Sequence, residues 1–279
     1  MKLDRTSDPV SPGMAPLEPV QVPAVVKAIG IIRILNMHPD SGSVLSDIAD
    51  TLSITKSHCH NILRTLVAHG WVEYDSATRR YRLSSGIAAD SSSALVSRTH
   101  LAVIRPIAEK LAENVGYPCI LAEPLADGSF LIVHTSKFQD LSILNAPVGY
   151  RFPPGTAAQM KAKLAWLPAA EEAAELERWT PVRHSKTSIM DKEVLRADLA
   201  VCRERGYARS AGEYVEGFTT IALPIFNREG RVFLILSIGS AAASINPREA
   251  EVAGAMIEAV AQVHAAIDGR PPVNFPRPR

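Results

Sequence analysis

Cysteine is scarce in this sequence, and the three cysteines it has are far apart. Cys59, Cys119 and Cys202 show no paired spacing that would indicate a disulfide framework or a metal site. The N-terminal residues do not have the pattern of a secretory signal either. We therefore expect a cytoplasmic protein with three reduced thiols, of which Cys119 lies in a packed core.

An excess of charge of one sign and long apolar runs are also missing. The 30 Lys and Arg residues are nearly balanced by 29 Asp and Glu residues, so the net charge of +1 excludes a bulk polycation. The longest apolar run, around Val232 to Ile238, has the length of a strand, and we expect no membrane partner. With 47% hydrophobic residues, a chain of 279 residues is predicted to form about two domains with sizeable cores.

The motifs of common enzyme classes are absent as well. No G-x-S-x-G, no H-E-x-x-H and no G-x-G-x-x-G after a strand occurs, and residues 155–161 lack the second glycine and the Lys-Ser/Thr pair of a phosphate-binding loop. His58, Cys59 and His60 are adjacent, but successive helical residues point apart, which disfavours a single metal site. The sequence therefore predicts no catalytic residue, no metal and no cofactor.

The stretch from Ser53 to Trp71 has the pattern of a helix with two different faces. Thr55 can cap its start and Gly70 can end it in a left-handed conformation. The apolar face is predicted to comprise Cys59, Ile62, Leu63, Leu66 and Val67. The opposite face carries small hydrogen-bonding groups, namely Lys56, Ser57, His58, His60, Asn61, Arg64 and Thr65. Two interpretations are open for this face: a solvated surface, or a surface that enters a DNA groove.

The neighbouring segments favour DNA. Pro23 suits the first turn of a helix that stops before Pro39, and a second, short helix from Asp47 to Leu52 has Ser46 as its N-cap. Together with residues 53–71 these helices have the order of a helix-turn-helix, whose second helix lies in the major groove.

Residues 71–83 are predicted to form a β-hairpin behind this motif. Residues 71–74 and 81–83 are short alternating or aromatic runs, and the turn between them carries Arg79 and Arg80. Placed behind a helix-turn-helix, such a hairpin is a wing whose arginines reach phosphate or the minor groove; a merely solvated turn is the alternative. Most cations between residues 21 and 85 lie on the helix of residues 53–71 or on this wing, but the excess of positive charge is small. We therefore expect a dimer to be needed for useful DNA affinity.

The remaining segments organise the rest of the chain. Proline-rich residues 1–20 predict a disordered arm, residues 21–85 a DNA-binding domain, and residues 86–100 a linker helix. Residues 101–270 alternate helices with strand pairs, including a third, weaker strand at 141–148, and residues 271–279 are predicted to be a loose tail. Strands grouped with helices at one face predict an α+β domain with an antiparallel sheet.

Taken in this order, the chain resembles the IclR family of bacterial transcription regulators from about Val22 to Ala266. The residues that carry the resemblance are Lys56, Ser57, Leu63, Thr65, Leu66, His69, Gly70, Val72 and Tyr81-Arg82-Leu83. The resemblance implies a winged helix-turn-helix followed by a GAF-like effector-binding domain.

Two departures from the family concern the reading of DNA bases. Asn61 stands where the family usually has arginine, and His58 stands where threonine is common. Asparagine favours adenine and arginine guanine, so the operator of relatives does not transfer.

Polar groups set into apolar strands indicate a small-molecule site in the second domain. Thr220 lies near the start of one strand and Ser237 within another, and Thr156 and Gln159 lie where a helix begins, whose free N–H groups favour an anion. Leu141, Leu144 and Phe218 would wall the site. The alternative is that the hydroxyls bond nearby backbone and the apolar residues are core. The family resemblance adds Ala158, Ser210 and Gly239 to the predicted effector site. The chain also departs from the family here: Gln159 and Met160 are larger than the small residues usual there, and Ser210 replaces an acidic residue that is common in the family.

These observations give two functional hypotheses of different classes. The first is a ligand-responsive repressor of a catabolic operon, forming a homodimer or homotetramer on an inverted-repeat operator in double-stranded DNA and sensing a small organic or aromatic acid. The second is a small-molecule enzyme whose N-terminal domain serves only for assembly. A helix-turn-helix used for protein contact alone is a third possibility.

Overall fold

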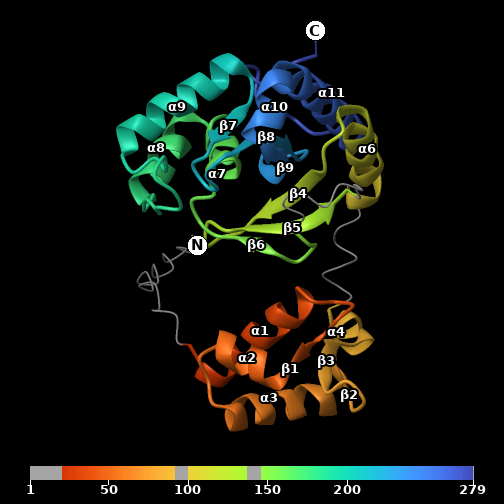
Figure 1. Cartoon of the computed structure of the whole chain (residues 1–279). Coiled ribbons are helices and arrows are strands. Elements are labelled where there is room, and N and C mark those ends of the chain that lie inside the picture. The colour runs from red at the N-terminus through yellow and green to blue at the C-terminus, as the bar shows by residue number, and fades with distance from the viewer. Residues whose placement is uncertain (1–20, 92–99, 137–145, 279) are drawn as a thin grey trace, which may run out of the picture. The chain divides into compact units, whose positions relative to one another are not determined.

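The computed structural model describes residues 21–91, 100–136 and 146–278. The chain divides into two compact units, Met1–Ile87 and Ala88–Arg279 (Figure 1). Three expectations from the sequence lie outside the described residues: the arm at 1–20, most of the linker, and the predicted pocket residues Leu141 and Leu144.

The first unit is a three-helix domain with a small sheet. Helices α1 (Pro23–Asn36), α2 (Leu45–Thr51) and α3 (Lys56–Ala68) are followed by the hairpin β2 (Val72–Asp75) and β3 (Arg80–Leu83), then by α4 (Ser85–Asp90). A two-residue strand, β1 (Ser43–Val44), pairs with β3 and gives the order β1-β3-β2. One core joins all three helices and the hairpin, and includes Ile31, Leu35, Ile48, Cys59, Leu63, Val72 and Tyr81.

Two local predictions in this unit were wrong. Helix α2 begins at Leu45, with Val44 as its N-cap and no side-chain cap, so Ser46 lies inside the helix instead of capping it. Val67 was assigned to the apolar face of α3 but is 37% exposed, because the core closes over Cys59, Leu63 and Leu66 without it. The expected roles of Thr55 and Gly70 are confirmed: the Thr55 hydroxyl accepts from the His58 N–H, and Gly70 has φ 71°.

The second unit is built on one antiparallel sheet, which confirms the α+β class. Six strands have the order β6-β5-β4-β9-β8-β7. The strands are β4 (Cys119–Pro124), β5 (Phe130–Thr135), β6 (Arg151–Phe152), β7 (Ala208–Ala211), β8 (Phe218–Phe226) and β9 (Val232–Ala241). The helices are α6 (His100–Val115), α7 (Ala157–Leu164), α8 (Ala169–Arg178), α9 (Lys192–Arg205), α10 (Ala242–Ile245) and α11 (Glu249–Ile267), with a 3-10 turn at Asn246–Arg248 before α11.

One face of the sheet is covered by α7. Directly opposed and alternate residues of neighbouring strands share a face, and the pairings Ser210–Thr220–Gly239 and Ala222–Ser237 therefore align five of the predicted effector residues. These five are Ser210, Phe218, Thr220, Ser237 and Gly239. Gln159 of α7 donates to the Ser237 hydroxyl at 3.4 Å, which places α7 over them.

The opposite face is covered from the other end of the chain. The Thr219 hydroxyl bonds the Asn246 side chain at 2.8 Å, and the Arg209 guanidinium bonds Glu249 at the start of α11. Helix α11 packs against α6 and β8, and Figure 1 shows α6 and α11 on the side away from α7, α8 and α9.

Helix α11 and α10 together form the one segment of the described residues that is long and apolar enough to cross a membrane by length and composition, Ala242–Ile267. The segment contains Arg248, Glu249, Glu251 and Glu258, so it is not an uninterrupted apolar run. The segment is rich in alanine, and Val252, Met256, Val260 and Val263 are each at most 2% exposed in the core. These buried side chains show that α11 packs against the core of the second unit.

One further expectation for this unit was wrong, and another lies mostly outside the described residues. Of the weak strand predicted at 141–148, only residues 146–148 are described, and these are not in a strand; β5 pairs with β6 at residues 151–152. The C-terminal residues were expected to be loose, but Phe275 is 6% exposed and its ring lies against those of Trp166, Phe226 and His264. A single large aromatic side chain is enough to hold a proline-rich segment against a core.

Candidate functional site

Helix α3 presents a row of exposed polar side chains. Cys59, Leu63 and Leu66 are buried, which fixes the helix on the domain and turns its other face outward. The six residues predicted on this helix are all exposed: Lys56, Ser57, His58, His60, Asn61 and Arg64. None of their side chains has an ion-pair or hydrogen-bond partner within residues 21–91, so their donors and acceptors are available to a ligand.

The hairpin beside α3 is ordered by its own polar contacts. The Asp75 carboxylate accepts from the Ala77 N–H at 2.9 Å and the Thr78 hydroxyl at 2.7 Å, and these bonds lower the pKa of Asp75. Glu73 pairs with Arg82 at 3.3 Å. The Glu73 charge is therefore partly offset by Arg82, whereas Asp75 stays ionised and orders the turn.

Arg79 and Arg80 lie differently on this wing. Arg79 is exposed at the end of the turn with φ 57°, and its guanidinium has no hydrogen-bond or ion-pair partner within residues 21–91. The Arg80 guanidinium instead donates to the carbonyls of Gly42 at 2.9 Å and Ser41 at 3.3 Å. Arg80 thus braces the hairpin against the loop before β1, a role that sequence reasoning missed because the two segments are distant in the chain.

The second candidate site lies where α7 meets the sheet. Gln159 is 4% exposed and Ser237 is 1% exposed, and the hydrogen bond between them joins helix to sheet. Ala158 is buried beside Gln159. The Thr156 hydroxyl donates to the Pro153 carbonyl at 2.7 Å and does not cap α7, so this part of the local-backbone alternative is correct for Thr156.

The far end of the same face is less covered. Phe218, Thr220 and Gly239 are partly exposed, whereas Ser210 is 4% exposed. Thr220 lies against Gly239: a Cβ added there would be 2.8 Å from the Thr220 hydroxyl oxygen. The structure thus brings Ala158, Gln159, Ser210, Phe218, Thr220, Ser237 and Gly239 to one region, with Thr156 at its edge.

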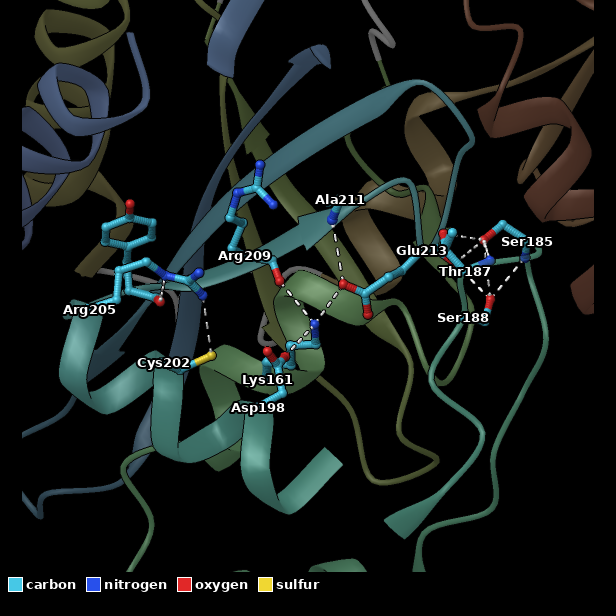
Figure 2. Close-up of polar contacts among 11 residues, drawn as sticks. Lys161, Ser185, Thr187, Ser188, Asp198, Cys202, Arg205, Arg209, Ala211 and Glu213 are labelled. Atoms are coloured by element: carbon cyan, nitrogen blue, oxygen red, sulfur yellow. Dashed lines mark hydrogen bonds and ion pairs between the residues drawn. The ribbon is translucent and has the colours of Figure 1, made fainter. Parts of the chain in front are cut away.

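A buried lysine next to this region was not recognised from the sequence as functional. Lys161 of α7 is 2% exposed at its side chain, and its ammonium contacts Asp198 at 2.6 Å, Glu213 at 2.7 Å and the Arg209 carbonyl at 3.0 Å (Figure 2). One cation therefore ties together α7, α9 and the loop after β7. The pairing of Lys161 with Glu213 spans 52 residues and could not be inferred from the sequence.

Glu213 extends this network into a second loop. Its backbone carbonyl accepts from the hydroxyls of Ser188 at 2.8 Å and Ser185 at 3.1 Å (Figure 2). Tyr214 follows, with its ring edge-on to His184 and Phe152, and burial together with Tyr150 raises the pKa of Tyr214 to about 12. Loops 184–188 and 211–217 are thus fixed to each other and, through Lys161, to the helix over the sheet.

The described residues contain no group of three or more His, Cys, Asp or Glu side chains that could hold a metal ion. Cys59, Cys119 and Cys202 are free and buried, and burial raises the pKa of each thiol. Thiols in this state are poor nucleophiles.

A winged helix-turn-helix with an unpaired polar recognition face, followed by a sheet domain, defines the class of DNA-binding transcription regulators. The comparisons agree with this class: residues 24–76 match the family model of the IclR helix-turn-helix domain, and residues 93–265 match that of the bacterial transcriptional regulator IclR C-terminal domain. The chain belongs to the IclR family of bacterial transcription regulators.

Similar proteins match along most of their length. The HTH-type transcriptional regulator XynR of Escherichia coli is 27% identical over 237 residues, covering 82% of this chain and 90% of that protein. The acetate operon repressor of Salmonella typhimurium is 27% identical over 232 residues, covering 82% and 85%.

Solved structures give the same result for the fold. An IclR transcriptional regulator from Alicyclobacillus acidocaldarius is 28% identical, with a TM-score of 0.70 and coverage of 88% of this chain and 99% of that chain. An IclR homologue from Microbacterium hydrocarbonoxydans, solved in complex with 4-hydroxybenzoate, is 20% identical, with a TM-score of 0.68 and coverage of 88% and 99%.

Proposed function

We propose that this protein is a ligand-responsive repressor of a catabolic operon that senses a small organic or aromatic acid. The observation that carries the proposal is the exposed polar face of α3, on which the side chains of Lys56, Ser57, His58, His60, Asn61 and Arg64 have no ion-pair or hydrogen-bond partner within the described part of the first unit. The position of α3 as the second helix of an IclR helix-turn-helix domain, matched at residues 24–76, favours DNA contact over a merely solvated surface.

DNA reading is assigned to α3 and phosphate binding to the wing. Ser57, His58, Asn61 and Arg64 contact base edges, with Asn61 suited to adenine and Arg64 to guanine. Lys56 and His60 lie beside them and contact the backbone. Arg79 is free to reach phosphate, and Arg80, whose fork has five donors, keeps donors for a second contact while it braces the wing.

The effector is assigned to the α7 face of the sheet. The hydroxyls of Ser210, Thr220 and Ser237, with the amide of Gln159, offer neutral hydrogen-bonding groups, and the start of α7 at Thr156 and Ala158 favours a carboxylate. The residues Leu141 and Leu144 belong to the same proposal. The aromatic acid bound by the Microbacterium homologue makes 4-hydroxybenzoate the first probe.

A homodimer or homotetramer on an inverted repeat completes the proposal, because one domain of this small excess charge makes few phosphate contacts. The protein would act in the cytoplasm, where its operator is.

The test measures whether adding a candidate effector weakens the binding of the protein to DNA. Purified full-length protein is bound to labelled DNA from upstream of its own gene, and organic and aromatic acids are added one at a time. An acid at one hundred times its dissociation constant is expected to raise the free energy of unfolding by about 2.7 kcal/mol and to weaken DNA binding. If no acid changes either quantity, the effector part of the proposal is wrong.

A further inference from the structure

The second unit has a cleft at the opposite end of α7 from the proposed effector face. It encloses about 680 Å³ and lies between α8, α9, the β8–β9 turn and the C-terminal segment. Its apolar wall includes Trp166 and Leu176, and its polar wall includes Arg196, Arg203 and Arg270. None of the residues proposed for effector binding lines it, so the cleft is a separate site of a size that accepts a small molecule.

Positive charge dominates the lining. Glu172 is the one carboxylate among the lining residues, and it is already paired with Arg203 at 2.7 Å. Arg203 also donates to the Ala165 carbonyl at 2.8 Å, so that its guanidinium is fixed in place. Arg270 has no side-chain partner in the described part of the chain, and Arg196 has only an exposed pair with Glu193. An exposed pair contributes little and does not prevent Arg196 from binding another anion.

The wall that carries Arg270 is held in position. Phe275 is 6% exposed, with its ring centroid 5.3 Å from Trp166 and 5.3 Å from Phe226. The Arg270 N–H donates to the Asn227 carbonyl at 3.0 Å, which fixes the other end of the segment. The cleft is therefore formed before any ligand arrives, which lowers the cost of binding.

Part of this wall lies beyond the segment that matches the family model. The match to the IclR C-terminal domain ends at residue 265, whereas Arg270, Pro272 and Asn274 of the lining lie beyond it. The C-terminal segment thus supplies both Arg270 and the side of the cleft that carries it.

We propose that the cleft is a second ligand site, which binds a small organic anion through Arg196 and Arg270. Guanidinium groups bind carboxylate and phosphate oxygens with two parallel hydrogen bonds. Arg203 and Glu172 shape the floor, and Trp166 and Leu176 contact the carbon skeleton. Both a polycarboxylate and a phosphate compound present a pair of anionic oxygens, which is the group that these two arginines would bind.

Isothermal titration of the full-length protein with citrate and, separately, with pyrophosphate tests the proposal and distinguishes the two sources. We expect one of them to bind with one site per chain, at an affinity that falls as salt is raised. Arg196→Gln combined with Arg270→Gln is expected to weaken binding at least tenfold. The matched control, Arg183→Gln combined with Arg277→Gln, removes the same charge from exposed positions outside the cleft and is expected to change affinity less than twofold.

Two results would overturn the proposal. One is that neither anion binds at millimolar concentration, and the other is that both double variants lose affinity equally, which would indicate only a general charge effect. A further variant, Thr220→Val on the effector face, is expected to leave citrate or pyrophosphate binding unchanged. Loss of binding in that variant would assign the anion to the effector face instead of the cleft.

Discussion

Lys161 is the residue on which the arrangement around the effector face most depends. Its ammonium is buried between two carboxylates, and removing one partner of a buried pair leaves uncompensated charge, at a cost of about 3–5 kcal/mol. We expect Lys161→Met to lower the free energy of unfolding by this amount in urea denaturation followed by circular dichroism. Lys163→Met, on the same helix but in a half-exposed pair with Glu175, is the control and should cost about 1 kcal/mol or less. Equal losses in the two variants would contradict this role for Lys161.

His264 is expected to make stability depend on pH. It is 7% exposed, its Nε2 accepts from the Phe226 N–H at 3.0 Å, and burial lowers its pKa to about 4. An unfolded histidine has a pKa of about 6.5, so the unfolded state binds more protons between these values. The stabilisation is complete above pH 6.5 and is lost as the pH falls toward 4, by about 2–3 kcal/mol.

The measurement for His264 is urea unfolding at several pH values. His264→Gln keeps an acceptor near Phe226 but cannot titrate, so its stability should fall less between pH 7 and pH 4 than that of the unsubstituted protein. A parallel decline in both proteins would show that other groups cause the pH dependence.

At the scale of elements, the N-terminal cap of α3 gives the sharpest prediction. The Thr55 hydroxyl accepts from the His58 N–H at 3.2 Å, and loss of such a cap costs about 1 kcal/mol. Thr55→Ala should therefore lower the stability of the first unit by about that amount, and Thr55→Ser should restore most of it. Hydrogen exchange of the first turn of α3 checks the prediction; unchanged protection in Thr55→Ala would contradict it.

Much of the fold could be predicted because local patterns determine it. The apolar spacing of α1 and α3 reflects burial on one side, and the nearly continuous apolar runs of β8 and β9 reflect burial on both faces of the sheet. A sequence displays both patterns directly. The longest apolar run of the sequence, around Val232 to Ile238, lies within β9, Val232–Ala241. Strands β1 and β7 were missed because they are short and are held by pairing with segments distant in the sequence.

The candidate site could be predicted only in its composition. The hydroxyls of Thr220 on β8 and Ser237 on β9 could be picked out because they stand in apolar strands, and the register of the two strands places them on one face. The Lys161 network and the packing of Phe275 could not be predicted, because each depends on contacts across long stretches of chain. Arg80 shows the same limit, since its contact with Gly42 spans 38 residues.

For the whole molecule, two units with different tasks explain the balanced charge. On the proposal that DNA affinity comes from a few cations on α3 and the wing, neither unit needs a strongly basic surface. Only a ligand with different affinity for two arrangements of the protein can change DNA binding. The effector face has the elements for this, because Lys161 and Glu213 join its helix to two loops that frame it.

DNA binding by a recognition-helix variant tests the central claim most directly. Fluorescence anisotropy measures the affinity of full-length protein for DNA from upstream of its gene and for unrelated DNA of equal length. We expect at least tenfold preference for the upstream DNA, and we expect Asn61→Ala combined with Arg64→Ala to remove it, since each base contact contributes about 1–3 kcal/mol. His69→Ala, exposed just beyond the end of the same helix, should keep the preference. Equal affinity for both DNAs, or a preference that survives the double substitution, would contradict the assignment of α3 as the element that reads DNA.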